Sequence, residues 1–122
     1  MFRRSSSMQK ISIWLITIGL AWIFMAAGLA KLEWQPEMLD NFRRWGYADW
    51  FVQLVGLGEV TAALLLLLPK TAPIAAGLLA ALMLGGLATH LWWYQYEEAL
   101  APLLLGTLSL LLMALRRRQA AA

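Results

Sequence analysis

The sequence predicts an all-α integral membrane protein, a bundle of four transmembrane helices with one short amphipathic helix at the membrane surface. Its residues are 61% hydrophobic, whereas soluble domains are roughly 45–50% apolar. Four long apolar segments are separated by turn or polar signals, and each is too long for a strand. Because a helix satisfies its own backbone hydrogen bonds in hydrocarbon, we interpret all four as transmembrane helices. We expect a single transmembrane domain over residues 1–122.

Proline and basic residues define the expected ends of these helices. Pro69 stops the second segment, and Pro73 suits the first turn of the third. The fourth segment ends at the basic run that begins with Arg116, and residues 119–122 are expected to fray. A cleavable signal peptide is disfavoured at the first segment, because about 20 apolar residues exceed the roughly 7–15 of a signal core. The predicted transmembrane helices cover residues 11–32, 50–68, 73–94 and 100–115.

A short amphipathic helix is expected at residues 36–45, in the connection between the first two transmembrane helices. Pro36 suits a first helical turn, and Gly46 suits the position just after a helix. Apolar side chains recur at helical spacing along one edge, at Met38, Leu39, Phe42 and Trp45. Such a helix is typical of one that lies on the membrane surface. The alternative is a lid over a site that opens between the transmembrane helices.

The basic residues predict the orientation in the membrane. One side carries Arg3, Arg4, Lys10, Lys70, Arg116, Arg117 and Arg118, and the other side carries Lys31, Arg43 and Arg44. By the positive-inside rule, both termini are expected in the cytoplasm. The connections at residues 33–50 and 95–99 then lie outside, where nearby Trp and Tyr residues form an aromatic belt.

Several function classes lack support in the sequence. There is no cysteine, which excludes thiolate chemistry, iron–sulfur ligation and Cys-based zinc sites. The single histidine and the scattered acids do not predict a metal site. The basic residues lie towards the ends of the chain and form no stripe among aromatics, so nucleic-acid binding is not expected. No nucleotide, haem or flavin motif is recognisable, and we expect no cofactor in the chain itself.

Glu59 is an ionisable residue within the second apolar segment. It lies nine residues after Trp50, or roughly 13 Å along a helix, which is near the middle of the membrane. Gly56 and Ala63 share its helical face and permit close approach of a neighbouring helix. Because exposure to lipid costs several kcal/mol, Glu59 should face the bundle interior. The structural alternative is a hydrogen bond or ion pair that holds helix register, and the protonation state is left open.

Two further polar residues are expected in the same half of the membrane as Glu59. Lys31 closes the first helix, and His90 lies near the end of the third. We predict a polar pocket or ligand-binding site formed by Lys31, Glu59 and His90, with Trp92 and Trp93 beside it. The structural alternatives are a lysine that reaches to water and a partly hydrated interfacial histidine. Small residues spaced four apart on the third helix, among them Gly85, predict close helix packing.

Four segments together resemble the DoxX-like family of small four-helix membrane proteins: GLAKL at 28–32, FRRWG at 42–46, GLGE at 56–59 and GGLATH at 85–90. The resemblance spans almost the whole chain and implies a bundle in a bacterial cytoplasmic membrane. Lys31, Glu59 and His90 match polar positions that recur in the family. The family takes its name from a subunit of a thiosulfate:quinone oxidoreductase, so the resemblance also implies a link to respiratory or redox chemistry.

Three functions follow as hypotheses, and whether the protein is an enzyme is left undecided. In the first, a membrane subunit binds a quinone beside an oxidoreductase partner subunit: His90 or Lys31 donates to a carbonyl, Glu59 relays protons, and Trp92 or Trp93 flanks the ring. The second is a non-catalytic scaffold or assembly protein. The third is a small proton-coupled transporter, although in the small multidrug resistance family the acid lies on the first helix. Contact with the lipid bilayer is common to all three, and oligomerisation is left open.

Overall fold

The computed structural model describes residues 7–121 as five helices joined by short connections. The helices are α1 (Ser7–Leu32), α2 (Pro36–Arg44), α3 (Asp49–Leu66), α4 (Ala72–Trp92) and α5 (Leu100–Ala121). By length and apolar composition, α1, α3, α4 and α5 can each cross a membrane. The prediction of an all-α membrane bundle with a short helix between its first two spans is therefore confirmed.

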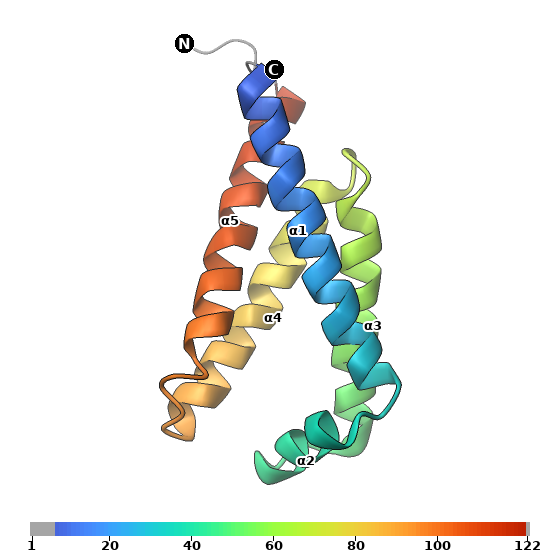
Figure 1. Cartoon of the computed structure of the whole chain (residues 1–122), viewed down its shortest axis with the longest axis vertical. Coiled ribbons are helices and arrows are strands. Elements are labelled where there is room, and N and C mark those ends of the chain that lie inside the picture. The colour runs from blue at the N-terminus through green and yellow to red at the C-terminus, as the bar shows by residue number, and fades with distance from the viewer. Residues whose placement is uncertain (1–6, 122) are drawn as a thin grey trace.

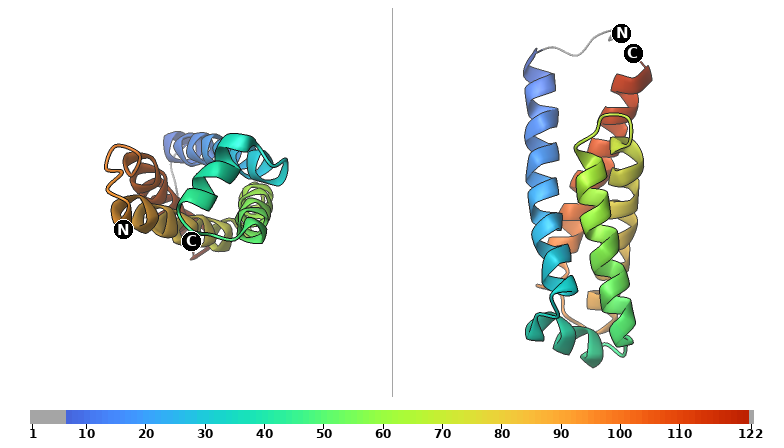
Figure 2. Two further views of the ribbon diagram at one scale, coloured as in Figure 1. Left: turned by 90° about the horizontal axis from the view of Figure 1, so that it is seen from below. Right: turned by 90° about the vertical axis from the view of Figure 1, so that its right-hand side faces the viewer.

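The bundle consists of two helix pairs that diverge. α1 lies along α3, and α4 lies along α5 (Figure 1). The pairs meet at the end that holds both chain termini and separate towards the opposite end, where α2 lies (Figure 1). We call these the termini end and the α2 end. Viewed from below, α2 crosses the space between the pairs (Figure 2).

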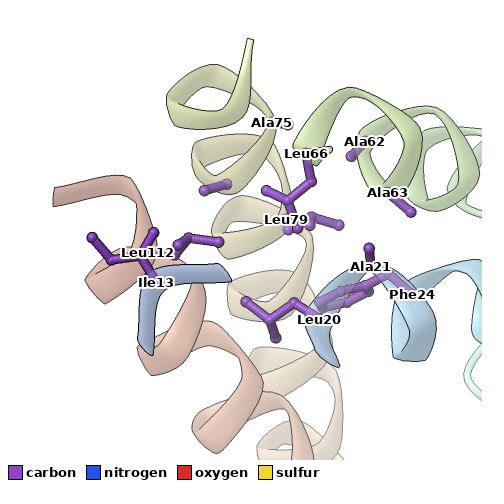
Figure 3. Close-up of a cluster of buried hydrophobic side chains, with 11 residues drawn as sticks. Ile13, Leu20, Ala21, Phe24, Ala62, Ala63, Leu66, Ala75, Leu79 and Leu112 are labelled. Atoms are coloured by element: carbon purple, nitrogen blue, oxygen red, sulfur yellow. The ribbon is translucent and has the colours of Figure 1, made fainter. Parts of the chain in front are cut away.

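The apolar core occupies the region where the pairs meet. Phe24 of α1, Leu66 of α3, Leu79 of α4 and Leu112 of α5 are almost completely buried and belong to one cluster (Figure 3). Ile13 and Leu20 of α1 belong to the same cluster, and its alanines on α1, α3 and α4 let the helices approach. The outward faces carry large exposed apolar side chains, such as Leu64, Ile74 and Leu84, which suit contact with lipid. Close packing therefore holds the two pairs together at one end.

The observed helix ends differ from the predicted ones, most clearly in α5. The helix continues through the basic run to Ala121, so the predicted end at residue 115 and the expected fraying of residues 119–121 were wrong. Arg and Ala are good helix formers, and nothing in the run interrupts a helix. Arg116 is also buried: its Nη2 donates to Thr17 Oγ1 at 3.1 Å, and its guanidinium stacks on Trp14. These contacts of Arg116 hold α5 against α1 beyond residue 115, where the apolar segment of α5 ends.

The α2 helix ends as its sequence predicts and is linked to α3. Gly46 has φ +88°, and the Gly46 and Tyr47 N–H groups donate to the Arg43 and Phe42 carbonyls, each at 3.0 Å. This paired arrangement is a Schellman end, which favours glycine because of the positive φ. Arg43 also makes two hydrogen bonds with Asp49, at 2.9 and 2.7 Å, which raise the pKa of its guanidinium. Phe42 is buried, so the apolar edge of α2 faces the bundle and agrees with the lid interpretation.

Candidate binding cavity

A cavity of about 570 Å³ lies between the two helix pairs, on the α2 side of the core. All five helices contribute to its wall, and α2 lies across its end. The lining is mostly apolar, as in typical small-molecule sites, and the volume falls within their range of about 300–1,000 Å³. The polar side chains on its wall are Lys31, Asn41, Tyr47, Glu59, Thr89 and His90.

The wall formed by α1 and α3 depends on contact between two glycines. A Cβ on Gly28 would lie 2.8 Å from the Gly56 carbonyl oxygen, and one on Gly56 would lie 2.9 Å from the Gly28 oxygen. No side chain fits in either place without a shift of backbone. Lys31 and Glu59 each follow one of these glycines by three residues, which places them on the same helical face as their glycine. The glycine contact therefore brings the two charged side chains together.

Lys31 and Glu59 form a buried ion pair. Lys31 Nζ lies 2.8 Å from Glu59 Oε1, and the two side chains are only 10% and 3% exposed. The Lys31 ammonium has one further and long hydrogen bond, 3.5 Å to the Ala27 carbonyl oxygen. Gln53 Nε2 donates to the Lys31 carbonyl oxygen at 2.8 Å and connects the end of α1 to α3. Lys31 thus points into the bundle and does not reach to water.

A buried ion pair within a membrane protein is costly to maintain. Removing two charges from water carries a desolvation penalty that their attraction only partly offsets. Ionisable residues at such depth usually belong to a ligand, ion or proton pathway. The pair also lines the cavity, so its charges are available to a molecule bound there.

On the α4 wall, the position of one proton on His90 follows from its neighbours. Gln95 Oε1 lies 2.9 Å from His90 Nδ1 and 3.2 Å from Trp45 Nε1. An indole nitrogen can only donate, so the atom of Gln95 that faces both rings is its oxygen. His90 Nδ1 must then carry a hydrogen, which leaves Nε2 of the neutral ring as an acceptor. The Trp45 and His90 rings also meet edge to face, with centroids 5.2 Å apart.

The end of α4 places Gln95 over His90. Tyr94 has φ +58°, and the Gln95 N–H donates to the His90 carbonyl oxygen at 2.8 Å. This is again a Schellman end, here with an aromatic residue in a conformation that costs about 1 kcal/mol or more outside glycine. The turn returns the chain across the last helical residues, so the side chain of Gln95 can reach the ring of His90.

A second hydrogen-bonded contact joins the α2–α3 connection to α4. Thr89 Oγ1 donates to the Gly85 carbonyl oxygen at 2.9 Å and lies 2.7 Å from Tyr47 Oη. Since the threonine hydroxyl has a single proton, Tyr47 is the donor between the two hydroxyls. Together with the contact between Trp45 and Gln95, it holds the residues that follow α2 against α4.

The structure brings three of the five predicted site residues together. Lys31, Glu59 and His90 all line the cavity, whereas Trp92 and Trp93 do not and are 78% and 45% exposed. Trp92 follows His90 by two residues, which is a rotation of about 200° around a helix. Its side chain consequently points away from the cavity, and the predicted position of the two tryptophans beside the pocket was wrong.

The role expected for Gly85 was also wrong. A Cβ on Gly85 would have no atom within 4 Å, and the residue lines the cavity. Its small size leaves space where a helix contact was expected. The predicted close packing does occur at Gly77, another member of the same series, where a Cβ would lie 3.2 Å from Met113 Sδ of α5; a Cβ on Gly106 of α5 would likewise lie 3.1 Å from Met83 Cβ.

Sequence reasoning did not assign Gln95 or Tyr47 to the site. Both lie in connections. The turn at Gly46 brings Tyr47 onto the cavity wall, and the turn at Tyr94 brings Gln95 to the ring of His90. The sequence feature that could have assigned Tyr47 to the site was its position directly after the predicted helix end at Gly46. No group of three His, Asp or Glu residues within residues 7–121 is arranged to hold a metal ion.

The protein has four membrane-length helices, and they surround a cavity that contains a buried ion pair. These features define a small integral membrane protein of the helical-bundle class. The chain belongs to the DoxX-like family, whose sequence profile matches residues 15–112. The matched region includes α2 and all the polar residues of the cavity wall. Comparisons with curated proteins and with solved structures gave no match.

Proposed function

We propose that the protein binds a lipid-soluble molecule of the quinone class in this cavity and acts as a membrane subunit beside an oxidoreductase. The observation that carries the proposal is the Lys31–Glu59 ion pair, buried on the wall of a mostly apolar cavity. A quinone ring is flat and apolar with carbonyl acceptors on its edge. Phe24, Phe42 and Phe51 supply an aromatic lining for the ring, and the ion pair supplies a donor for a carbonyl.

Lys31 and His90 differ in the hydrogen bonds that they can offer to a ligand. The Lys31 ammonium has three protons, and only one is needed for Glu59, so another can be donated to a ligand carbonyl. Neutral His90 offers an acceptor at Nε2, which suits the hydroxyl of a quinol better than the carbonyl of a quinone. Lys31 rather than His90 is therefore the carbonyl donor in this proposal.

Reduction of a quinone to a quinol takes up two electrons and two protons. In our proposal the electrons come from the oxidoreductase partner, and Glu59, next to Lys31, takes part in transfer of the protons. The chain then contributes binding, orientation and a proton route.

The second candidate function is a scaffold in which the ion pair only holds helix register. The Gly28–Gly56 contact favours it, since the ion pair lies one turn from that contact and closes the same interface. The two functions differ in what the cavity is for. Filling the cavity should abolish ligand binding and should leave a scaffold unaffected.

The test is binding of a quinone with a single isoprene unit to protein in lipid nanodiscs, followed by quenching of tryptophan fluorescence. Gly85→Leu places a side chain in the cavity at a position where a Cβ meets no atom within 4 Å, and it should weaken binding roughly tenfold or more, or 1.4 kcal/mol. Gly19→Leu is the matched control, because Gly19 has the same free space at Cβ but is exposed outside the cavity. Equal affinity of wild type and Gly85→Leu would exclude the cavity as the site.

Glu59→Gln separates the two candidate functions, because it removes the charge and keeps the size of the side chain. Loss of quinone binding in a variant that unfolds at the wild-type temperature supports binding by the ion pair. Loss of thermal stability with unchanged affinity supports the scaffold.

A further inference from the structure

We infer that the cavity opens sideways into the bilayer between α1 and α5, and that its ligand enters there and leaves a long apolar tail in the lipid. This inference rests on the proposed function and adds to it the chemical class of the ligand, an amphipathic lipid with a polar ring and a polyprenyl-type tail.

The first observation is where α1 and α5 contact each other. Thr17 and Arg116 are hydrogen-bonded near the termini end, where Ile13 and Leu112 are both buried in the core. From this point the two helices separate towards the α2 end (Figure 1). α1 and α3 stay in contact further along, at Gly28 and Gly56. The α3–α4 side also widens towards the α2 end (Figure 1), but there the connection after α2 is held to α4 by the hydrogen bond between Tyr47 and Thr89.

The second observation is the exposure of residues that line the cavity. Ile23 on α1 and Ala101 on α5 both line it, and both are solvent-exposed. Ala81 and Gly85, on α4 behind the gap, are also cavity residues with exposed surface. Cavity and outer surface are therefore continuous between α1 and α5.

The third observation is the chemistry of the opening compared with that of the α2 end. The residues around the gap are apolar or glycine, and none carries a charge: Ile23, Ala27, Ala81, Gly85, Ala101 and Leu105. At the α2 end, by contrast, Phe42 is buried and two side-chain hydrogen bonds hold the residues after α2 to α4. An apolar molecule thus has a route through the gap, while the water-facing end is covered.

The arrangement of polar groups orients the ligand. Lys31, Glu59 and His90 lie on the cavity wall, whereas the gap itself offers no hydrogen-bond partner from a side chain. A polar ring is bound inside, and a tail attached to it passes through the gap into the hydrocarbon. A ligand without a tail is bound by the ring alone.

The experiment compares two quinones, one with a single isoprene unit and one with a full polyprenyl tail, on the whole protein in nanodiscs. Ala101→Trp places a bulky side chain at the edge of the gap, and Ala26→Trp places one on an exposed position of α1 that does not line the cavity. Ala101→Trp should weaken binding of the long-tailed quinone roughly tenfold more than it weakens binding of the short quinone. Ala26→Trp should affect neither.

The absence of natural cysteine allows a second measurement that does not depend on how the Trp variant folds. Ala101→Cys and Ala26→Cys can be labelled with a fluorescent maleimide after assembly into nanodiscs. The long-tailed quinone should protect the label at position 101 from a lipid-attached quencher, and position 26 should show no protection.

Each other outcome has a defined meaning. If wild type binds neither quinone, the proposed function itself fails. If it binds both and neither Ala101→Trp nor the label at 101 responds to the tail, the lateral opening is overturned and the proposed function stands. A wild-type dimer that Ala101→Trp dissociates without a change in long-tail affinity would show that a second copy covers the gap, which also overturns the inference.

Discussion

The two walls of the cavity use small residues for opposite purposes. On the α1–α3 wall, Gly28 and Gly56 bring two backbones into contact. On the α4 wall, a Cβ on Gly85 would meet no atom within 4 Å, so this glycine leaves the cavity open. A glycine in a membrane helix can therefore either make a helix interface or make space, and its neighbours across the bundle decide which.

The polar groups of the two walls differ in the same way. Lys31 and Glu59 bond to each other across an interface that the glycines already hold in place. His90 and Thr89 bond instead to Gln95 and Tyr47, which lie in connecting segments. We expect the α1–α3 wall to be rigid and the α4 wall to adapt when a ligand binds.

The largest expected effect is that of Gly56→Leu on the rigid wall. The new Cβ would lie 2.9 Å from both the Gly28 carbonyl oxygen and Lys31 Cβ, so α1 and α3 must separate. Because backbone and not only side chains must move, we expect a loss of about 5 kcal/mol or more in the free energy of unfolding, above the usual cost of overpacking. Thermal unfolding in detergent measures it, with Gly19→Leu and Gly85→Leu as controls that should unfold like wild type. If Gly56→Leu and Gly85→Leu behave alike, the contrast between the walls is wrong.

An intermediate effect is expected from removing one member of the ion pair. Lys31→Met and Glu59→Leu each leave a buried charge without its partner, at a cost of about 3–5 kcal/mol. The double variant replaces both charges with apolar side chains and should recover most of the loss. Thermal unfolding of the four proteins forms a double-mutant cycle. Losses that simply add would show that the pair is not coupled in the membrane.

The smallest effect is expected from Gln95→Leu on the adaptable wall. It removes the hydrogen bonds from Trp45 and His90, with a cost of about 1–2 kcal/mol for the two. Gln95→Leu should also change the tautomer of His90, the single histidine of the chain. Without Gln95 Oε1 as acceptor, the ring should lose its preference for a proton on Nδ1. Nitrogen NMR of His90 reports this directly. Thr89→Val removes the contact with Tyr47 and should leave the histidine signal unchanged. A wild-type spectrum with the proton on Nε2 would contradict the assignment.

Much of the fold could be predicted from the sequence because it depends on local properties. In hydrocarbon a backbone must bond to itself, so each long apolar segment forms a helix whatever surrounds it. Pro36 and Gly46 define α2 through their own backbone preferences, and Gly46 has the expected positive φ. The place of Glu59 within the second long helix likewise follows from counting residues along the apolar segment.

The tertiary structure alone decided how the helices are rotated and how far apart they lie. Spacing along α4 puts His90 and Trp92 on opposite faces, but it cannot say that the face of His90 lines a cavity, nor that Gly85 does. The sequence placed Lys31 and His90 within reach of Glu59, and only the Gly28–Gly56 contact selects Lys31 as the ion-pair partner. Helix formation is determined within a few residues of chain, whereas rotation and separation depend on contacts between segments far apart in sequence, which no local pattern specifies.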